Sequence, residues 1–121
     1  MITILVVDDE TDIRELIYLV LKYTPGLEAN IILCSTGDRG REHLEEANLV
    51  ISDAQIPGEE PFAFALEACD KGLPVILVTG RDNVPLGIRQ KMRVVTKPFA
   101  PKRLANVVEE VVEGIRESVL L

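Results

Sequence analysis

Hydrophobic and polar positions alternate in blocks along the chain, and the blocks predict alternating strands and helices. Short runs of aliphatic and β-branched residues are typical of strands that are buried on both faces of a sheet. Such runs predict strands at residues 2–7, 31–34, 49–51, 75–78 and 93–96. Asp8 and Asp9 end the first run, Asp53 ends the third, and Thr79 ends the fourth.

The segments between these runs place apolar residues at helical spacing, which predicts a helix after each strand. Helices are expected between Asp9 and Pro25, at 38–47, at 62–69, at 82–92 and at the end of the chain. The segment 82–92 contains Pro85 and Gly87, so its helix should be short or poorly stable. The last helix has the clearest period, and its apolar stripe consists of Leu104, Val107, Val108, Val111, Val112 and Ile115.

This order of elements predicts an α/β protein with a flavodoxin-like, doubly wound fold. Five βα units in succession, a (βα)5 arrangement, predict a five-stranded parallel sheet with helices on both faces. A chain of 121 residues is long enough for one such core, so residues 1–121 are expected to form a single domain. Ligands of such folds bind at the carboxyl ends of the strands.

The composition of the chain excludes several classes of function. Hydrophobic residues make up 47% of the chain and the formal net charge is -7, without a basic patch that would hold a phosphate backbone, so direct nucleic-acid binding is not expected. No apolar run approaches the roughly 20 residues that span a bilayer, so no membrane association is expected. Cys34 and Cys69 lack metal-ligand spacing and are expected to be buried, reduced thiols, which favours a cytoplasmic location.

Three acidic residues are expected to meet at the carboxyl edge of the sheet. Asp8 and Asp9 follow the first strand and Asp53 follows the third. Three neighbouring carboxylates repel one another, and a hard divalent cation with oxygen ligands relieves that repulsion. Mg²⁺ fits because it is commonly held by one or two carboxylates and leaves positions for phosphate oxygens. The alternative for Asp8 and Asp9 is that they only cap the first helix.

Lys97 and Thr79 could bind a phosphoryl group at this edge of the sheet. The Lys97 ammonium is suited to a phosphoryl oxygen, and Thr79 offers a hydroxyl beside Gly80, which allows close approach. A carboxylate such as Asp53 can attack phosphorus to form an aspartyl phosphate, and the transfer needs mainly alignment and charge neutralisation. Alone, Lys97 would be a surface lysine and Thr79 an ordinary strand-end residue; together they predict phosphoryl transfer.

Four motifs resemble the receiver domain of two-component response regulators. They are LVVDD at 5–9, ISDAQIP at 51–57, ILVTG at 76–80 and VVTKPF at 94–99, and the resemblance covers the whole chain. It implies that Asp53 accepts a phosphoryl group from a sensor histidine kinase or a histidine phosphotransfer protein. It also implies that Mg²⁺ is held by Asp8, Asp9, Asp53 and the main-chain carbonyl of Gln55, most directly by Asp9 and Asp53.

The resemblance further implies how the domain switches. Lys97 would pair with the phosphoryl oxygens, Thr79 would move to bond one of them, and the Lys97–Pro98 peptide would be cis. The segment 82–92, the fifth strand and the last helix would form the surface that changes. A downstream protein target or a fused effector domain would bind this surface. A phosphorylation-dependent homodimer is a further expected assembly.

Several positions depart from the family pattern. Val94 stands where the family usually has Tyr or Phe, whose rotation accompanies the threonine shift. Pro61 stands where Gly is usual, so the loop that leads into the third helix should be altered. Ile56 replaces a common Met, and Gln55 and Arg81 occupy the variable positions that influence how fast water attacks the acyl phosphate.

Two other functions compete with the phosphorylated switch. A degenerate receiver would keep the fold as a phosphate-independent interaction module, which Val94 favours and the intact acidic residues, Thr79 and Lys97 oppose. A haloacid-dehalogenase-like phosphatase would need its aspartyl nucleophile on the first strand in a DxD arrangement, which residues 8–10 do not supply. We therefore expect a signalling domain rather than an enzyme, with at most self-catalysed phosphorylation and autodephosphorylation.

Overall fold

The computed structural model describes residues 1–120, and the side chains of residues 1–118. The strands are β1 (Ile2–Val7), β2 (Ala29–Cys34), β3 (Leu49–Asp53), β4 (Val75–Thr79) and β5 (Arg93–Thr96). The helices are α1 (Thr11–Lys22), α2 (Gly37–Arg41), α3 (Ala63–Asp70), α4 (Leu86–Arg89) and α5 (Pro101–Leu120). Strands and helices alternate strictly along the chain, as the sequence predicts.

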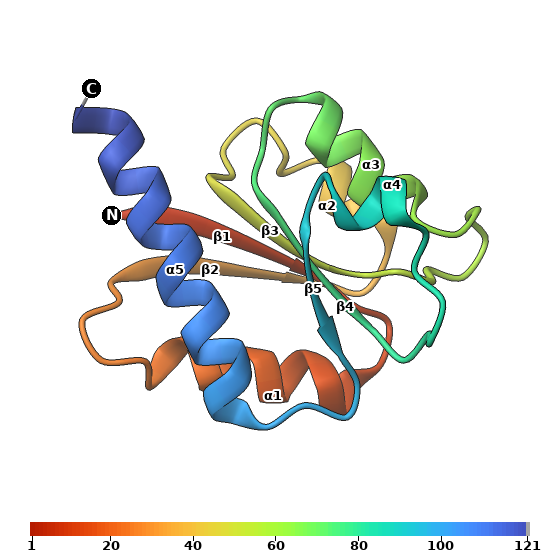
Figure 1. Ribbon diagram of the computed structural model, residues 1–121, viewed down its shortest axis with the longest axis horizontal. Coiled ribbons are helices and arrows are strands. Elements are labelled where there is room, and N and C mark those ends of the chain that lie inside the picture. Colours follow the sequence, from red (N-terminus) through yellow and green to blue (C-terminus); the bar gives the residue numbers. More distant parts are fainter. Residues whose placement is uncertain (121) are drawn as a thin grey trace.

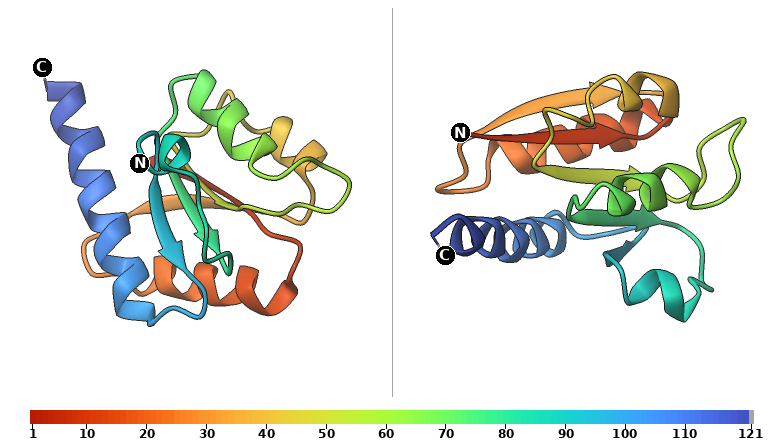
Figure 2. Two further views of the ribbon diagram at one scale, coloured as in Figure 1. Left: turned by 45° about the vertical axis from the view of Figure 1, so that its right-hand side comes forward. Right: turned by 90° about the horizontal axis from the view of Figure 1, so that it is seen from above.

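The five strands form one parallel sheet in the order β2-β1-β3-β4-β5. Helices α1 and α5 lie on one face, and α2, α3 and α4 lie on the other (Figures 1 and 2). The predicted flavodoxin-like, doubly wound α/β fold is confirmed. Because the chain passes from β1 to the edge strand β2 before it reaches β3, β1 and β3 become neighbours at the point where the strand order reverses.

The central strands β1, β3 and β4 are buried on both faces, which explains their unbroken apolar runs. Ile4 and Val6 of β1 belong to the core on the α1 and α5 side, whereas Leu5 and Val7 belong to the core under α2, α3 and α4. All four side chains are fully buried. Each residue of the run therefore removes apolar surface from water, on whichever face it points.

Helix α2 is shorter than the predicted helix 38–47, which is a correction to the sequence interpretation. It spans five residues, Gly37–Arg41, begins after the Thr36 cap, and is followed by turns. The predicted segment offers only Leu44 and Ala47 to the core, and two apolar side chains provide little packing energy to extend a helix. Strand β2 also begins two residues before the predicted residue 31.

The last two helices confirm their predictions and differ strongly from each other. Helix α4 has four residues after Pro85, and its Leu86 side chain is 70% exposed. Helix α5 has 20 residues, and Leu104, Val107 and Val108 on its apolar stripe are fully buried. Long-range packing therefore stabilises α5 far more than α4.

The cysteine and membrane predictions can also be compared with the structure. Cys34 is buried as predicted, Cys69 is only half-buried, and both are free thiols. Burial raises the pKa of both thiols. Within residues 1–120, no helix combines the length and the apolar composition needed to cross a membrane.

Candidate functional site

The parallel sheet brings four polar residues of the sequence prediction to one edge. Asp8 follows β1, Asp53 is the last residue of β3, Thr79 is the last residue of β4, and Lys97 follows β5. The strand register pairs Asp53 with Val78 and Thr79 with Thr96, so the ends of the central strands are level. Adjacent parallel strands that end together necessarily place their final side chains close to one another.

Lys97 lies at the centre of this group. Its ammonium nitrogen is 3.2 Å from Asp8 Oδ2, 3.2 Å from Asp53 Oδ2 and 3.3 Å from Glu10 Oε1. The Lys97 main-chain N–H donates a hydrogen bond of 2.8 Å to the carbonyl of Thr79, which fixes the chain after β5 to β4. The Lys97–Pro98 peptide is cis, which confirms that prediction. The structure thus brings Asp8, Asp53 and Lys97 together.

Burial makes the charges of this group interact strongly. Asp8 is 1% exposed, and burial raises its pKa, although the main-chain N–H of Glu10 and the Lys97 ammonium act in the opposite direction. Burial lowers the pKa of Lys97, but the charges of Asp8 and Asp53 outweigh that effect and raise it overall. Lys97 is therefore protonated at neutral pH and compensates charges that water no longer solvates.

The acidic residues of this group fit a hard divalent cation. Carboxylate oxygens of Asp8, Glu10 and Asp53 all lie within 4.8 Å of one another. Against these three carboxylates stands the single ammonium of Lys97, which leaves a formal charge of two negative. Oxygen ligands with uncompensated negative charge are what Mg²⁺ requires. The donor set thus fits the ion that the sequence predicts.

The surroundings of Asp8 and Lys97 differ from the sequence prediction at Asp9, Glu10 and Arg14. Asp9 is exposed and lies outside this group of carboxylates, so its role as a direct ligand stays a prediction. Glu10 takes part although the sequence interpretation did not include it; its position two residues after Asp8 was the available signal. Arg14 was also missed, and its Nη1 donates a hydrogen bond of 2.8 Å to the Asp8 carbonyl.

The loop after β3 carries the predicted main-chain ligand. The Gln55 N–H donates a hydrogen bond of 3.3 Å to Asp53 Oδ1, which holds the backbone of Gln55 beside the acid. Gly58 and Phe62 of this loop have positive φ, and Phe62, with φ of 67°, is the one that is not glycine. Pro61, at the position where the family usually has Gly, could not take that conformation because its ring fixes φ near −65°. The ligand role of the Gln55 carbonyl stays a prediction.

Thr79 is buried at the edge of the site and already has a hydrogen-bond partner. Its side chain is 1% exposed, and its Oγ1 accepts a hydrogen bond of 3.0 Å from the Arg81 N–H. The Arg81 guanidinium lies 5.2 Å above the centre of the Phe62 ring, so it connects the loops that follow β3 and β4. Val94 of β5 is half-buried and packs against the core under α2, α3 and α4.

Comparisons with known proteins agree with this geometry. The chain is 28% identical over 110 residues to the C4-dicarboxylate transport transcriptional regulatory protein DctD of Rhizobium meliloti strain 1021. That alignment covers 86% of this chain and 24% of the relative, so the chain spans about a quarter of the length of this curated relative.

Two solved structures have the same fold. NtrX of Brucella abortus is 27% identical with a TM-score of 0.81, over 98% of this chain and 29% of that chain. A response regulator receiver domain from Clostridium thermocellum is 23% identical with a TM-score of 0.80, over the full length of both chains.

The family follows from a match that extends over most of the chain. The sequence model of the response regulator receiver domain matches residues 4–109, a range that contains every residue of the site described above. The chain belongs to the receiver domain family of two-component response regulators.

Proposed function

We propose that Asp53 accepts a phosphoryl group from a sensor histidine kinase or a histidine phosphotransfer protein in the presence of Mg²⁺. The observation that carries this proposal is the position of Lys97, whose ammonium lies 3.2 Å from both Asp8 and Asp53. A cation between two carboxylates at the carboxyl edge of a parallel sheet provides the charge neutralisation that phosphoryl transfer needs.

The transfer step uses the Asp53 carboxylate as a nucleophile. One of its oxygens forms a bond to phosphorus while the bond from phosphorus to the donor's imidazole nitrogen breaks, and the imidazole keeps the electron pair. Lys97 then stabilises the negative phosphoryl oxygens as well as the carboxylates that it already contacts. Asp53 is 8% exposed, so a donor reaches it from the solvent side of the edge.

The metal ligands of this proposal are Asp8, Asp9, Asp53 and the main-chain carbonyl of Gln55. Mg²⁺ supplies charge neutralisation at the phosphoryl oxygens when it is bound. The residues of the chain orient that site: Arg14 holds the Asp8 carbonyl, and the Gln55 N–H holds Asp53 Oδ1.

Phosphorylation would then change the surface formed by α4, β5 and α5. The Thr79 hydroxyl, which now accepts from the Arg81 N–H, would donate to a phosphoryl oxygen instead. That exchange would alter the loop between β4 and α4, without the aromatic rotation that Val94 cannot provide. A downstream protein target or a fused effector domain would read the surface, and a phosphorylation-dependent homodimer is part of the same proposal.

The proposal covers residues 1–121 as one receiver domain in the cytoplasm. The family match reaches from residue 4 to residue 109, and α5 continues without a break beyond it. Free Cys34 and Cys69 are compatible with a reducing compartment.

Intact-protein mass spectrometry tests the proposal. Incubation with acetyl phosphate and Mg²⁺ should add one phosphoryl mass to the wild-type protein, and Asp53→Asn should abolish the addition. Asp70→Asn, at the exposed end of α3, is the matched control and should be phosphorylated normally. An unchanged wild-type mass under saturating donor would contradict the proposal.

Two measurements separate the competing functions. A degenerate receiver would bind Mg²⁺ weakly and would show no change in amide spectra with beryllofluoride. A haloacid-dehalogenase-like phosphatase would turn over a phosphomonoester, which we do not expect because the candidate nucleophile lies on β3 rather than β1.

A further inference from the structure

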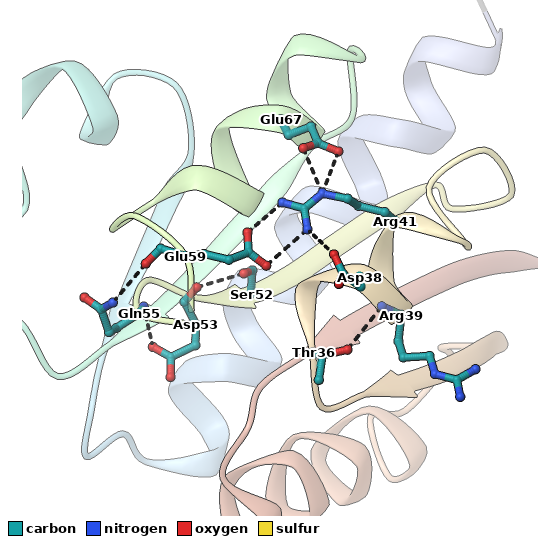
Figure 3. A network of polar contacts seen from close by, with 9 residues as sticks. All are labelled: Thr36, Asp38, Arg39, Arg41, Ser52, Asp53, Gln55, Glu59 and Glu67. Atoms are coloured by element: carbon teal, nitrogen blue, oxygen red, sulfur yellow. Dashed lines mark hydrogen bonds and ion pairs between the residues drawn. The ribbon is translucent and has the colours of Figure 1, made fainter. Parts of the chain in front are cut away.

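Arg41, the last residue of α2, contacts carboxylates from three other positions (Figure 3). Its Nη2 is 2.6 Å and its Nη1 is 3.1 Å from the two carboxylate oxygens of Glu59. Its Nε is 2.9 Å and 3.1 Å from the oxygens of Glu67, and its Nη1 is 3.2 Å from Asp38. We call these four residues the Arg41 cluster. They connect α2 with α3 and with the loop that follows Asp53.

The contacts of the Arg41 cluster differ in strength. The Asp38 side chain is 98% exposed and the Glu67 side chain is 38% exposed, so water screens both. The Glu59 side chain is only 17% exposed and pairs with the guanidinium through two parallel hydrogen bonds. Glu59 is therefore the carboxylate that Arg41 holds most firmly.

The Glu59 carboxylate also packs against α2. It lies directly on the backbone of Gly37, where a Cβ would come within 1.8 Å of Glu59 Oε2. The Arg41 guanidinium lies 5.5 Å from the centre of the Phe64 ring, which restricts the arginine as well. Only glycine at position 37 leaves room for this arrangement.

Glu59 belongs to the loop 54–62, which connects Asp53 to α3. The loop is closed at its base by a hydrogen bond of 2.8 Å from the Phe62 N–H to the Ala54 carbonyl. Gln55 links Asp53 with Glu59. Its N–H donates to Asp53 Oδ1, and its side-chain amide donates to the Glu59 carbonyl at 3.5 Å. Displacement of Glu59 would thus be transmitted to Gln55.

Little else attaches the far part of this loop to α2. A cavity of about 390 Å³ lies between the two, lined by Gly37 and Arg41 on one side and by Pro57, Gly58 and Glu59 on the other. Because apolar packing is missing across a cavity, the pair of Arg41 and Glu59 links residues 57–59 to α2, whereas Ala54, Ile56 and Phe62 anchor the ends of the loop in the core.

We infer that Arg41 is a positioning residue for the loop 54–62: by holding the Glu59 carboxylate it fixes Gln55 beside Asp53 and thereby strengthens Mg²⁺ binding. The effect on Mg²⁺ rests on the proposed function; the effect on the loop does not. Arg41 contacts neither Asp53 nor Lys97, so its influence on the site passes through Glu59.

Charge alone predicts the opposite result, which makes this inference testable. Removal of a positive charge near an acidic metal site favours a cation by Coulomb's law, so Arg41→Gln should tighten Mg²⁺ binding if only charge matters. Loss of the fixed loop weakens binding, because the loop must then be ordered when the ion binds. The sign of the change separates the two effects.

Amide hydrogen exchange of the metal-free protein tests the effect on the loop. Arg41→Gln and Glu59→Gln should both speed exchange at the Gln55, Glu59 and Phe62 amides. Glu67→Gln is the matched control, because it removes a contact of the same guanidinium but leaves the loop attached. Equal loop exchange in Glu59→Gln and Glu67→Gln would overturn the inference, and Glu59→Gln keeps the test decisive if Arg41→Gln does not fold.

Calorimetric titration with MgCl₂ tests the effect on the site. Arg41→Gln should weaken Mg²⁺ binding about threefold to tenfold. The Mg²⁺ affinity of Arg41→Lys should lie between those of the wild type and Arg41→Gln, because an ammonium keeps the charge but cannot form the paired hydrogen bonds. Arg39→Gln on the exposed side of α2 controls for charge and should not weaken binding.

Unchanged or tighter binding by Arg41→Gln would overturn the inference while the proposed function stands. A wild-type protein without Mg²⁺ binding would overturn the proposed function and the affinity effect together. The exchange comparison would then still decide whether Arg41 fixes the loop.

Discussion

The acidic site and the α4 segment lie on the same molecule but are held in different ways. At the site, Lys97 contacts Asp8 and Asp53 at 3.2 Å; the two acids follow or end the buried strands β1 and β3, and Lys97 follows the edge strand β5. The α4 segment has a four-residue helix, and its Leu86 side chain is 70% exposed. The sheet fixes the first region, whereas α4 has no buried residue of its own and is attached to the core through half-buried Ile88 and the flanking Val84 and Met92.

This difference teaches where such a domain can change. A charge placed on Asp53 meets partners that are already in position, so little energy is lost to rearrangement at the site. The α4 segment has few buried contacts to lose, which is the physical property of a region with low local stability. Substitutions in each region test whether the acidic site is rigid and the α4 segment is mobile.

Lys97→Met should have the largest effect, because it removes the only ammonium that contacts both Asp8 and Asp53 among the described residues. The rate of phosphorylation by acetyl phosphate should fall by about 10²–10³-fold, the usual loss for one preorganised charge partner. Time-resolved mass spectrometry measures the rate. Lys102→Met, an exposed lysine at the start of α5, should keep the wild-type rate. Similar losses in both variants would mean that the site is not specially preorganised.

Thr79→Val should separate the two regions. Phosphorylation of Asp53 should persist, but the beryllofluoride-induced change in the amide spectrum of α4 and β5 should shrink about tenfold or more. A hydrogen bond to a charged group contributes about 1.5–3 kcal/mol, and that contribution is lost with the hydroxyl. Thr96→Val is the control, since Thr96 is the exposed register partner of Thr79 on β5. A full spectral change in Thr79→Val would disprove the link through the hydroxyl.

Asp8→Asn should stabilise the metal-free fold at neutral pH. Burial raises the pKa of Asp8 above its ordinary value of 3.8, so the folded state binds this proton more tightly than the unfolded chain does. The resulting stability is complete below 3.8 and is lost as the pH rises through the folded pKa. At pH 7 the buried carboxylate therefore destabilises the fold, and its removal should add about 1 kcal/mol to the free energy of unfolding.

Urea denaturation without Mg²⁺ measures this change. The difference between Asp8→Asn and wild type should shrink as the pH falls through the folded pKa and disappear well below 3.8, where Asp8 is neutral in both states. Asp70→Asn should show no such pH dependence. A loss of stability in Asp8→Asn at pH 7 would show that the pair with Lys97 outweighs the burial of the charge.

Gly87→Ala should have the smallest effect and should stay local. A Cβ at Gly87 meets no atom within 4 Å, so alanine adds helix propensity of up to about 1 kcal/mol to α4 alone. Amide exchange within α4 should slow, with little change in the midpoint of global unfolding. Gly114→Ala in α5 has equally open surroundings and should raise global stability instead. A global gain in Gly87→Ala would show that α4 unfolds together with the sheet.

The sequence predicted what depends on the periodicity of strands and on their order. Asp8, Asp53, Thr79 and Lys97 could be placed together because parallel strands end at one edge, and that placement needs no knowledge of loops. Helix α2 could not be delimited, because its segment offers few apolar side chains and its length depends on packing against neighbours. Local patterns describe this part of the chain least well.

The Arg41 cluster and the participation of Glu10 could not be predicted for another reason. Arg41 and Glu59 are 18 residues apart, on a helix and a loop whose relative position no periodicity encodes. Glu10 contacts Lys97, which lies 87 residues later in the chain. Nothing in the sequence favours Glu10 over its neighbour Asp9 for this contact. Which of the two adjacent acids turns toward Lys97 depends on the backbone direction after β1.

The position of Lys97 bears on the order in which the chain can assemble. Lys97 is separated from Asp8 by 89 residues and from Asp53 by 44, whereas β1 and β3, which carry the two acids, pair directly. An intermediate in which β1 and β3 have docked before β5 would bring two carboxylates together without their cation. Electrostatic repulsion therefore disfavours a partly built sheet at neutral pH, and docking of the last strand and α5 removes it. The proposed phosphoryl transfer at the edge and the cooperativity of folding would thus depend on the same ammonium group.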